Sequence, residues 1–259
     1  MGKALRHGVI VVVLGAALTL AFGTVVAKQG AGAWREQMQA NNDINSTASL
    51  QRGARNFVNY CLGCHSLQYM RYSRVAEDLH IPEDQLEANL MFTGDRPHDA
   101  IMSAMPAKDA EQWFGRPPPD LTLTARARGT DYLYQFLKTF YVDESRASTT
   151  GVNNLALENA AMPHVLADLQ GLQRAVFNVE RAEDGTQVKV FEKFEQVTPG
   201  RISPEEYDEF VRDTVNFLDY ASEPAQLRRV SLGIWVIAFL LVFTGFAYAL
   251  KKEIWKDVH

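Results

Sequence analysis

Both cysteines of this 259-residue chain lie in one pentapeptide, Cys61-Leu62-Gly63-Cys64-His65. Two thiols this close could form a disulfide or bind a metal, but neither function explains the adjacent histidine. Cys-x-x-Cys-His is the attachment pattern of c-type haem. In that pattern the two thiols add to the haem vinyl groups, and the histidine becomes the proximal ligand of the iron. We therefore expect one covalently attached haem c, held by Cys61, Cys64 and His65.

The segments around the motif predict a mainly helical domain. Apolar residues at helical spacing predict a helix from Thr47 to about Tyr60, capped by Ser46 or Thr47, and a second over 131–140. Ser203-Pro204-Glu205-Glu206 is a capping box with proline at the first helical position, and it predicts a helix that packs across the first. Between these helices, alternating runs around Asp184-Gly185 predict two short strands, a small β-hairpin insertion within residues 172–197.

Two apolar segments flank this domain. Residues 9–26 follow two basic residues and end in small ones, which is typical of a secretory signal; an uncleaved anchor is the alternative. Residues 230–250 carry no charge, and 21 helical residues span ~32 Å, the thickness of a bilayer core. The expected organisation is a cleaved signal peptide over 1–27, an exported domain over 28–229, a transmembrane helix over 230–250 and a cytoplasmic tail over 251–259.

The composition excludes several classes of function. The chain has 26 basic and 31 acidic residues and a net charge of −5, which argues against a nucleic-acid binder. Hydrophobic residues make up 47% and charged residues 22%, as in ordinary folded proteins. We find no glycine-rich phosphate loop and no pairing of a nucleophile with a base. A bond-making site within this chain is therefore not expected.

An electron-carrying haem needs a second axial ligand, usually a methionine. Of the seven methionines, Met105 and Met162 are each followed by a proline that would stiffen a ligand loop. Their spacing from the motif does not choose between them, and His164 is a further candidate, more simply interpreted as an exposed histidine. The remaining methionines fall in the expected signal, near the motif, or in expected helix or core positions: Met1, Met38, Met70, Met91 and Met102.

Several blocks occur in one order along the chain: the extended haem segment 59–72, Arg116-Pro117-Pro118-Pro119-Asp120-Leu121, the segment 126–132, Ala161-Met162-Pro163 and a C-terminal anchor. Together these blocks resemble the cytochrome c1 family, the haem subunits of the cytochrome bc1 (quinol–cytochrome c reductase) complex. The resemblance covers about residues 35 to 255. No cysteine pair is left for a structural disulfide, so the chain resembles the smaller bacterial members of the family most.

The resemblance implies a c-type cytochrome domain with one C-terminal transmembrane helix and with Met162 as the sixth iron ligand. It also implies that Arg128 and Tyr132 approach a haem propionate, where a guanidinium can pair with a carboxylate. Pro118 and Pro119 would line the haem crevice. A backbone carbonyl there would orient the ring N–H of His65.

The resemblance also implies a function. Such a subunit takes one electron from a Rieske iron–sulfur protein and passes it to a cytochrome c acceptor, inside a dimeric complex with cytochrome b. The haem domain would lie in the periplasm, anchored to a bacterial inner membrane. Two other classes remain: a c-type subunit of a terminal oxidase or another dehydrogenase, and a haem-based sensor. The single haem motif, the C-terminal anchor and the Pro-Pro-Asp-Leu block argue against the first of these.

Overall fold

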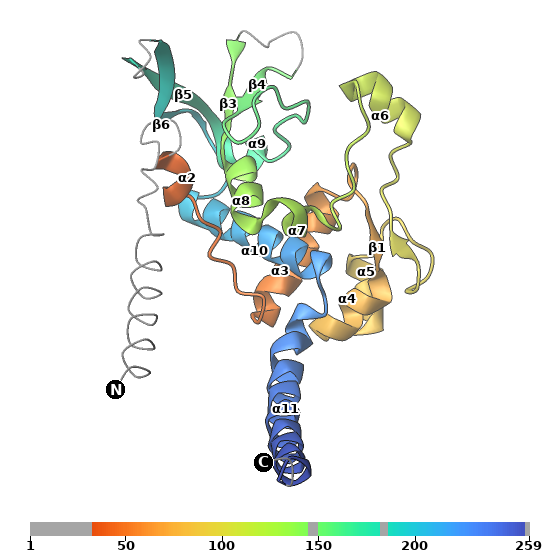
Figure 1. Ribbon diagram of the computed structural model, residues 1–259. Helices are drawn as coiled ribbons and strands as arrows, with labels where there is room; N and C mark the ends of the chain where they lie inside the picture. Colours follow the sequence, from red (N-terminus) through yellow and green to blue (C-terminus); the bar gives the residue numbers. More distant parts are fainter. Residues whose placement is uncertain (1–32, 145–149, 182–185, 257–259) are drawn as a thin grey trace, which may run out of the picture.

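The computed structural model describes residues 33–144, 150–181 and 186–256, and within them the architecture is mainly helical (Figure 1). The helices are α2 (Ala33–Gln37), α3 (Thr47–Tyr60), α4 (Tyr72–Leu79), α5 (Glu83–Asn89), α6 (Ala107–Phe114), α7 (Thr124–Arg128), α8 (Thr130–Lys138), α9 (Ala167–Gln170), α10 (Pro204–Ser222) and α11 (Gln226–Ile254). The strands are β1 (Leu67–Arg71), β2 (Ala100–Ile101), β3 (Phe140–Val142), β4 (Val152–Asn154), β5 (Gly171–Arg181) and β6 (Gln187–Pro199). The expected signal peptide over 1–27 lies outside the described residues.

The centre of the core is the crossing of α3 and α10, which confirms the expected packing of these two helices. The rings of Phe57 on α3 and Phe217 on α10 pack there with centroids 5.8 Å apart. A Cβ atom at Gly53 would lie only 2.1 Å from the backbone oxygen of Asp213. The two helices can therefore approach this closely only because residue 53 has no side chain.

Helices α3 and α10 begin where the sequence predicted, although the cap of α3 differs in detail. At α10, Ser203 Oγ accepts a hydrogen bond from the N–H of Glu206, and the Glu206 carboxylate accepts one from the N–H of Ser203. This confirms the capping box. Ser46 occupies the N-cap of α3, but its side chain makes no capping hydrogen bond.

The strands pair as three separate antiparallel two-stranded units, β1 with β2, β3 with β4, and β5 with β6. Figure 1 shows the β3–β4 and β5–β6 pairs together at the end of the molecule opposite α11. β5 and β6 have 11 and 13 residues, so the expectation of two short strands was wrong in length. The predicted Asp184-Gly185 turn between them lies outside the described residues.

One helix is shorter than predicted. The helix expected over 131–140 is α8, which ends at Lys138. Phe140 instead begins β3 and is 1% exposed, because pairing with Asn154 of β4 carries it into a small apolar cluster. The β1–β2 and β3–β4 pairs were not expected at all, since their strands are too short to show an alternating pattern.

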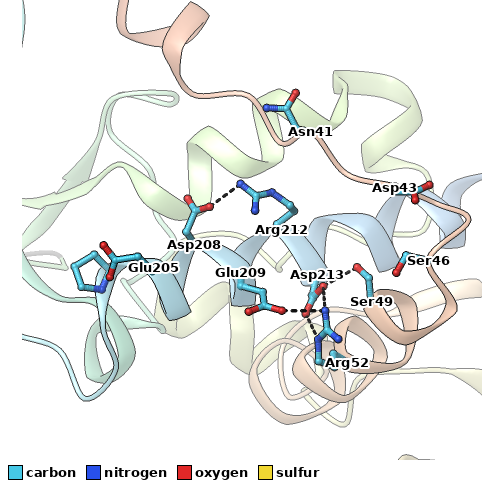
Figure 2. Close-up of a pocket in the computed structure, with 11 residues that line it drawn as sticks. Asn41, Asp43, Ser46, Ser49, Arg52, Glu205, Asp208, Glu209, Arg212 and Asp213 are labelled. Atoms are coloured by element: carbon cyan, nitrogen blue, oxygen red, sulfur yellow. Dashed lines mark hydrogen bonds and ion pairs between the residues drawn. The ribbon is translucent and has the colours of Figure 1, made fainter.

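A polar groove of about 710 Å³ runs beside the α3–α10 crossing (Figure 2). Arg52 pairs there with Asp213 and Glu209, and Arg212 pairs with Asp208. None of the residues proposed to bind haem lines this groove. We therefore assign its ion pairs to holding the two helices together.

The C-terminal helix α11 extends away from the helical core (Figure 1). It begins and ends four residues outside the expected span of 230–250. Its most apolar window has a mean hydropathy of 2.3, and none of that window is buried. Among the described residues, α11 is the one helix that is long and apolar enough to cross a membrane.

Candidate functional site

The haem motif forms a tight turn directly after α3. The N–H of Cys61 donates to the carbonyl of Phe57, and the N–H groups of Cys64 and His65 both donate to the carbonyl of Cys61, at 3.0 and 2.8 Å. The turn therefore continues the helical path and keeps both cysteines on one compact loop. Both thiols are free. Burial and the neighbouring Cys64 raise the pKa of Cys61 to about 12, and burial also raises the pKa of Cys64.

His65 is oriented by a backbone carbonyl, as the resemblance implied. Its Nδ1 lies 2.7 Å from the carbonyl oxygen of Pro119. Because a carbonyl can only accept, the proton must be on Nδ1, which leaves the lone pair of Nε2 available for a metal. Burial lowers the pKa of His65, while the Pro119 carbonyl acts in the opposite direction. The net effect favours the neutral imidazole, the form that binds iron.

The Pro119 carbonyl is itself held in place by the segment that follows it. The N–H of Leu121 donates to the carbonyl of Ser66 at 2.9 Å. The Asp120 carboxylate accepts from the N–H of Gln68 at 2.8 Å. These contacts bind the Pro-Pro-Asp-Leu block to the residues just after the motif, so the orientation of His65 depends on two segments about 54 residues apart.

A second group of predicted residues forms a continuous row. The guanidinium of Arg128 lies 4.8 Å from the centre of the Tyr132 ring, and Tyr132 stacks on Phe136 with centroids 6.2 Å apart. Phe136 and Met162 pack against the same small apolar cluster. Arg128 is exposed and takes part in none of the ion pairs of the described residues, so its charge is available for an external carboxylate.

The structure places each of the three candidates for the sixth ligand. The expectation that His164 is exposed was wrong. Its ring stacks on Phe140 with centroids 4.9 Å apart, its Nε2 is buried, and burial lowers its pKa to about 4. The N–H of Met105 donates to Ser103, whose hydroxyl donates to Gly63, so Met105 lies beside the attachment loop itself. Met162 packs against the apolar cluster of Phe140, Val152 and Ala160.

Two other methionines can be placed as well. Met91 packs against the main core, although it lies outside any helix. Met102 is 45% exposed, so the expectation of a helix or core position was wrong. It lies on the surface just after the short strand β2.

The donor groups fit a covalently attached haem. They comprise two free thiols on one turn, a neutral histidine with an available Nε2, a thioether among apolar side chains and a cation without an acidic partner. Within the part of the chain that the structure describes, no group of three or more His, Cys, Asp or Glu side chains could hold a metal ion. A separate metal centre therefore has no support there.

Sequence reasoning missed three residues that shape this site. Ser103 donates its N–H to Ser66 Oγ at 2.8 Å and its hydroxyl to the carbonyl of Gly63 at 2.9 Å, which holds the attachment loop. Asn153 and Asn154 bind the segment that leads to Met162. No local pattern marks any of the three, because most of their partners are backbone groups, which show no residue preference, and the others lie 10 to 37 residues away.

Known proteins resemble this chain over most of its length. The sequence profile of the Cytochrome C1 family matches residues 36–258. A protein named "Cytochrome c1" from Allochromatium vinosum is 49% identical over 236 residues, 91% of this chain and 94% of that protein. "Ammonia monooxygenase gamma subunit" from Nitrosomonas europaea is 47% identical over 211 residues, 82% of this chain and 84% of that protein. "Cytochrome b/c1" from Bradyrhizobium diazoefficiens is 25% identical over 249 residues, 82% of this chain and 33% of that protein.

The profile match and the 49% identity agree with the motif order and with the geometry around His65. The chain belongs to the cytochrome c1 family.

Proposed function

We propose that this chain passes single electrons from a Rieske iron–sulfur protein to a cytochrome c acceptor. Its membership of the cytochrome c1 family carries the proposal. Proteins of this family carry a covalently bound haem c, and the chain is accordingly a haem electron-transfer subunit of the cytochrome bc1 complex. The alternatives of an oxidase or dehydrogenase subunit and of a haem-based sensor are not favoured by these relatives.

Each predicted residue then has a distinct task. Cys61 and Cys64 would hold the haem covalently, and His65 and Met162 would be the two protein ligands of its iron. When bound, the haem supplies one-electron cycling between Fe(II) and Fe(III). Pro119 keeps the proton of His65 on Nδ1, so that Nε2 stays free to ligate. No bond-making site within this chain is needed for that chemistry.

The crevice around the haem is assigned to three more residues. The guanidinium of Arg128, which lies over the ring of Tyr132, would neutralise a propionate of the haem. Pro118 is half-buried beside Pro119 and lines the crevice.

The proposed topology follows from the two ends of the chain. Residues 1–27 form a cleaved signal peptide, 28–229 a periplasmic domain, 230–250 the membrane-spanning part of α11 and 251–259 a cytoplasmic tail. The protein is then anchored by one span in a bacterial inner membrane, with the β5–β6 hairpin as an insertion in the cytochrome domain. Cytochrome b is a partner in a dimeric complex, and the name of the "Cytochrome b/c1" relative supports that pairing.

Co-purification tests the complex. The tagged full-length chain is extracted from its native membrane in a mild detergent, and its partners are identified by mass spectrometry against an untagged strain. Recovery of a multi-haem cytochrome b and an iron–sulfur protein is expected. Recovery of oxidase or ammonia monooxygenase subunits in their place would overturn the proposed complex while leaving the haem assignment intact.

A pair of methionine variants tests the ligand. Met162→Leu should lose the optical band of methionine-coordinated ferric iron and should bind carbon monoxide in the ferrous state, because an axial position becomes open. Met105→Leu is the matched control, since Met105 also precedes a proline, and it should keep the wild-type spectrum. The reverse result would make Met105 the ligand.

A further inference from the structure

The segment between β4 and Met162 has no regular secondary structure. Residues 155–162 form neither helix nor strand, so their backbone N–H groups need partners other than a helical or sheet ladder. Two asparagines at the end of β4 supply such partners. Asn153 is 5% exposed and Asn154 is 1% exposed, although both side chains are fully polar. Buried amides of this kind are expected only where their hydrogen bonds are made.

Asn154 joins this segment to α8. Its Oδ1 accepts from the N–H of Ala156 at 2.8 Å, from the N–H of Leu157 at 3.2 Å and from the hydroxyl of Thr139 at 3.2 Å. Its Nδ2 donates to the carbonyl of Phe136 at 2.7 Å. One side chain therefore fixes the start of the segment and the last turn of α8 relative to each other.

Asn153 fixes the turn further along. Its Oδ1 accepts from the N–H of Asn159 at 2.8 Å and from the N–H of Asn154 at 2.9 Å. Its Nδ2 donates to the carboxylate of Asp143 at 3.0 Å. Asn159 has a φ of 62°, in the left-handed region that asparagine tolerates better than most residues. The chain reverses there and leads into Ala160.

The two anchors converge on Met162. Ala160 is 1% exposed and packs with Phe140 and Val152, and Met162 packs against the same cluster. Phe136, whose carbonyl Asn154 binds, packs against this cluster too and stacks on Tyr132. The hydrogen bonds of the two asparagines therefore fix α8 and the segment before Met162, the two parts of the chain that pack against this cluster.

We propose that Asn153 and Asn154 are positioning residues for the axial ligand, which keep Met162 on the iron by fixing the segment 155–162. This rests on the proposed function, because it takes Met162 as the ligand. Each asparagine uses both its acceptor and its donor, so neither alanine nor aspartate can replace it fully. Aspartate at 153 would also place a second carboxylate against Asp143.

The test compares buried asparagines in the full-length haem protein in detergent. Asn154→Ala should weaken or lose the methionine band of the ferric spectrum, lower the midpoint potential and increase carbon monoxide binding, while covalent haem content stays unchanged. Asn216→Ala is the matched control. Asn216 is 0% exposed and donates to the carbonyl of Asp43 and the hydroxyl of Ser49, on the α3–α10 side of the molecule. It should lower thermal stability without changing the band or the potential.

Met162→Leu, measured in parallel, separates two failures. If Met162→Leu leaves the band unchanged, the ligand assignment fails, and the proposal for the asparagines falls with it. If Met162→Leu removes the band while Asn154→Ala keeps the wild-type band and potential, only the positioning role is overturned. An equal spectral change in Asn216→Ala would also overturn it, since the effect would then be general destabilisation.

A second variant covers the case in which Asn154→Ala yields no haem protein. Asn154→Asp has nearly the same size and keeps the acceptor for Ala156 and Leu157, but it loses the donor to Phe136. It should shift the band and the potential in the same direction, by less than Met162→Leu does. Wild-type values in Asn154→Asp would overturn the proposal.

Discussion

Replacing Gly53 with alanine should destabilise this protein strongly, although Gly53 lies eight residues before the first cysteine of the motif. The new Cβ would lie 2.1 Å from the backbone oxygen of Asp213 and 2.7 Å from the Cβ of Phe217. Ordinary van der Waals contact begins at 3.4 Å, so the gap to Asp213 must widen by 3.4 − 2.1 = 1.3 Å. Neither atom belongs to the flexible end of a side chain, and α3 and α10 must therefore move apart along their contact.

The magnitude follows from two opposing contributions. Overpacking of a core costs ~1–3 kcal/mol and more where backbone must shift. Alanine in a helix is more favourable than glycine by ~1 kcal/mol. Because the clash is with backbone, we take the overpacking cost at its upper end, ~3 kcal/mol or more. After the ~1 kcal/mol gained from alanine, the free energy of unfolding should fall by ~2 kcal/mol or more. At ~2–4 °C per kcal/mol for a domain of this size, the Tm should fall by ~4–8 °C or more.

Gly245→Ala is the matched control, because it makes the same chemical change inside another helix, α11, away from the haem motif. A Cβ at Gly245 would have no atom within 4 Å, so the Tm should not fall by more than ~2 °C. Thermal unfolding of the full-length protein in detergent, followed by far-UV circular dichroism, compares the three proteins. The reasoning fails if Gly53→Ala unfolds with the wild type, or if Gly245→Ala loses as much stability.

Acid should reveal the contribution of Asp208. Although burial raises the pKa of this carboxyl group, hydrogen bonds from Lys138 and Tyr134 hold it below its usual value. The unfolded chain therefore takes up the proton first as the pH falls below about 4, and the wild type loses stability there. Asp208→Asn should lower the Tm at neutral pH and reduce this loss of Tm in acid. The control Asp168→Asn, which removes an exposed ion pair, should do neither. A chain that ends at Arg229 should move from the membrane pellet to the soluble fraction with its haem attached, because the apolar window of α11 buries nothing in the domain; its recovery in the pellet would indicate a second membrane contact.

Much of the fold could be read from local patterns. The helices α3 and α10 were predicted because one has an apolar face at helical spacing and the other begins with a capping box, and both signals act within a few residues. The end of α8 was not predicted. Phe140 continues the apolar spacing of that helix, but it pairs with Asn154 instead, and this partner lies 14 residues further along the chain.

The residues of the candidate site also differ in whether local sequence could identify them. Cys61, Cys64 and His65 could be identified because haem attachment needs three groups at one short spacing. The burial of His164 could not, since it depends on stacking against Phe140 from another segment. The choice between Met105 and Met162 came from family resemblance and stays a prediction; Met162 packs against the same apolar cluster as Phe136.

The sequence by itself determined that this chain binds haem c covalently, belongs to the cytochrome c1 family and has a C-terminal helix able to span a membrane. The haem motif, the order of the blocks and the hydropathy can all be read along the chain without knowing which distant residues meet. The tertiary structure decided which atoms make the contacts. The resemblance implied a carbonyl of the proline block beside His65, and the structure identifies it as that of Pro119, 54 residues away, which places the proton on Nδ1. The segment before Met162 has its shape because Asn154 reaches Phe136 and Thr139 across 18 and 15 residues. Hydrogen bonds of this kind join groups that meet only when the chain folds, and no spacing along the sequence encodes them.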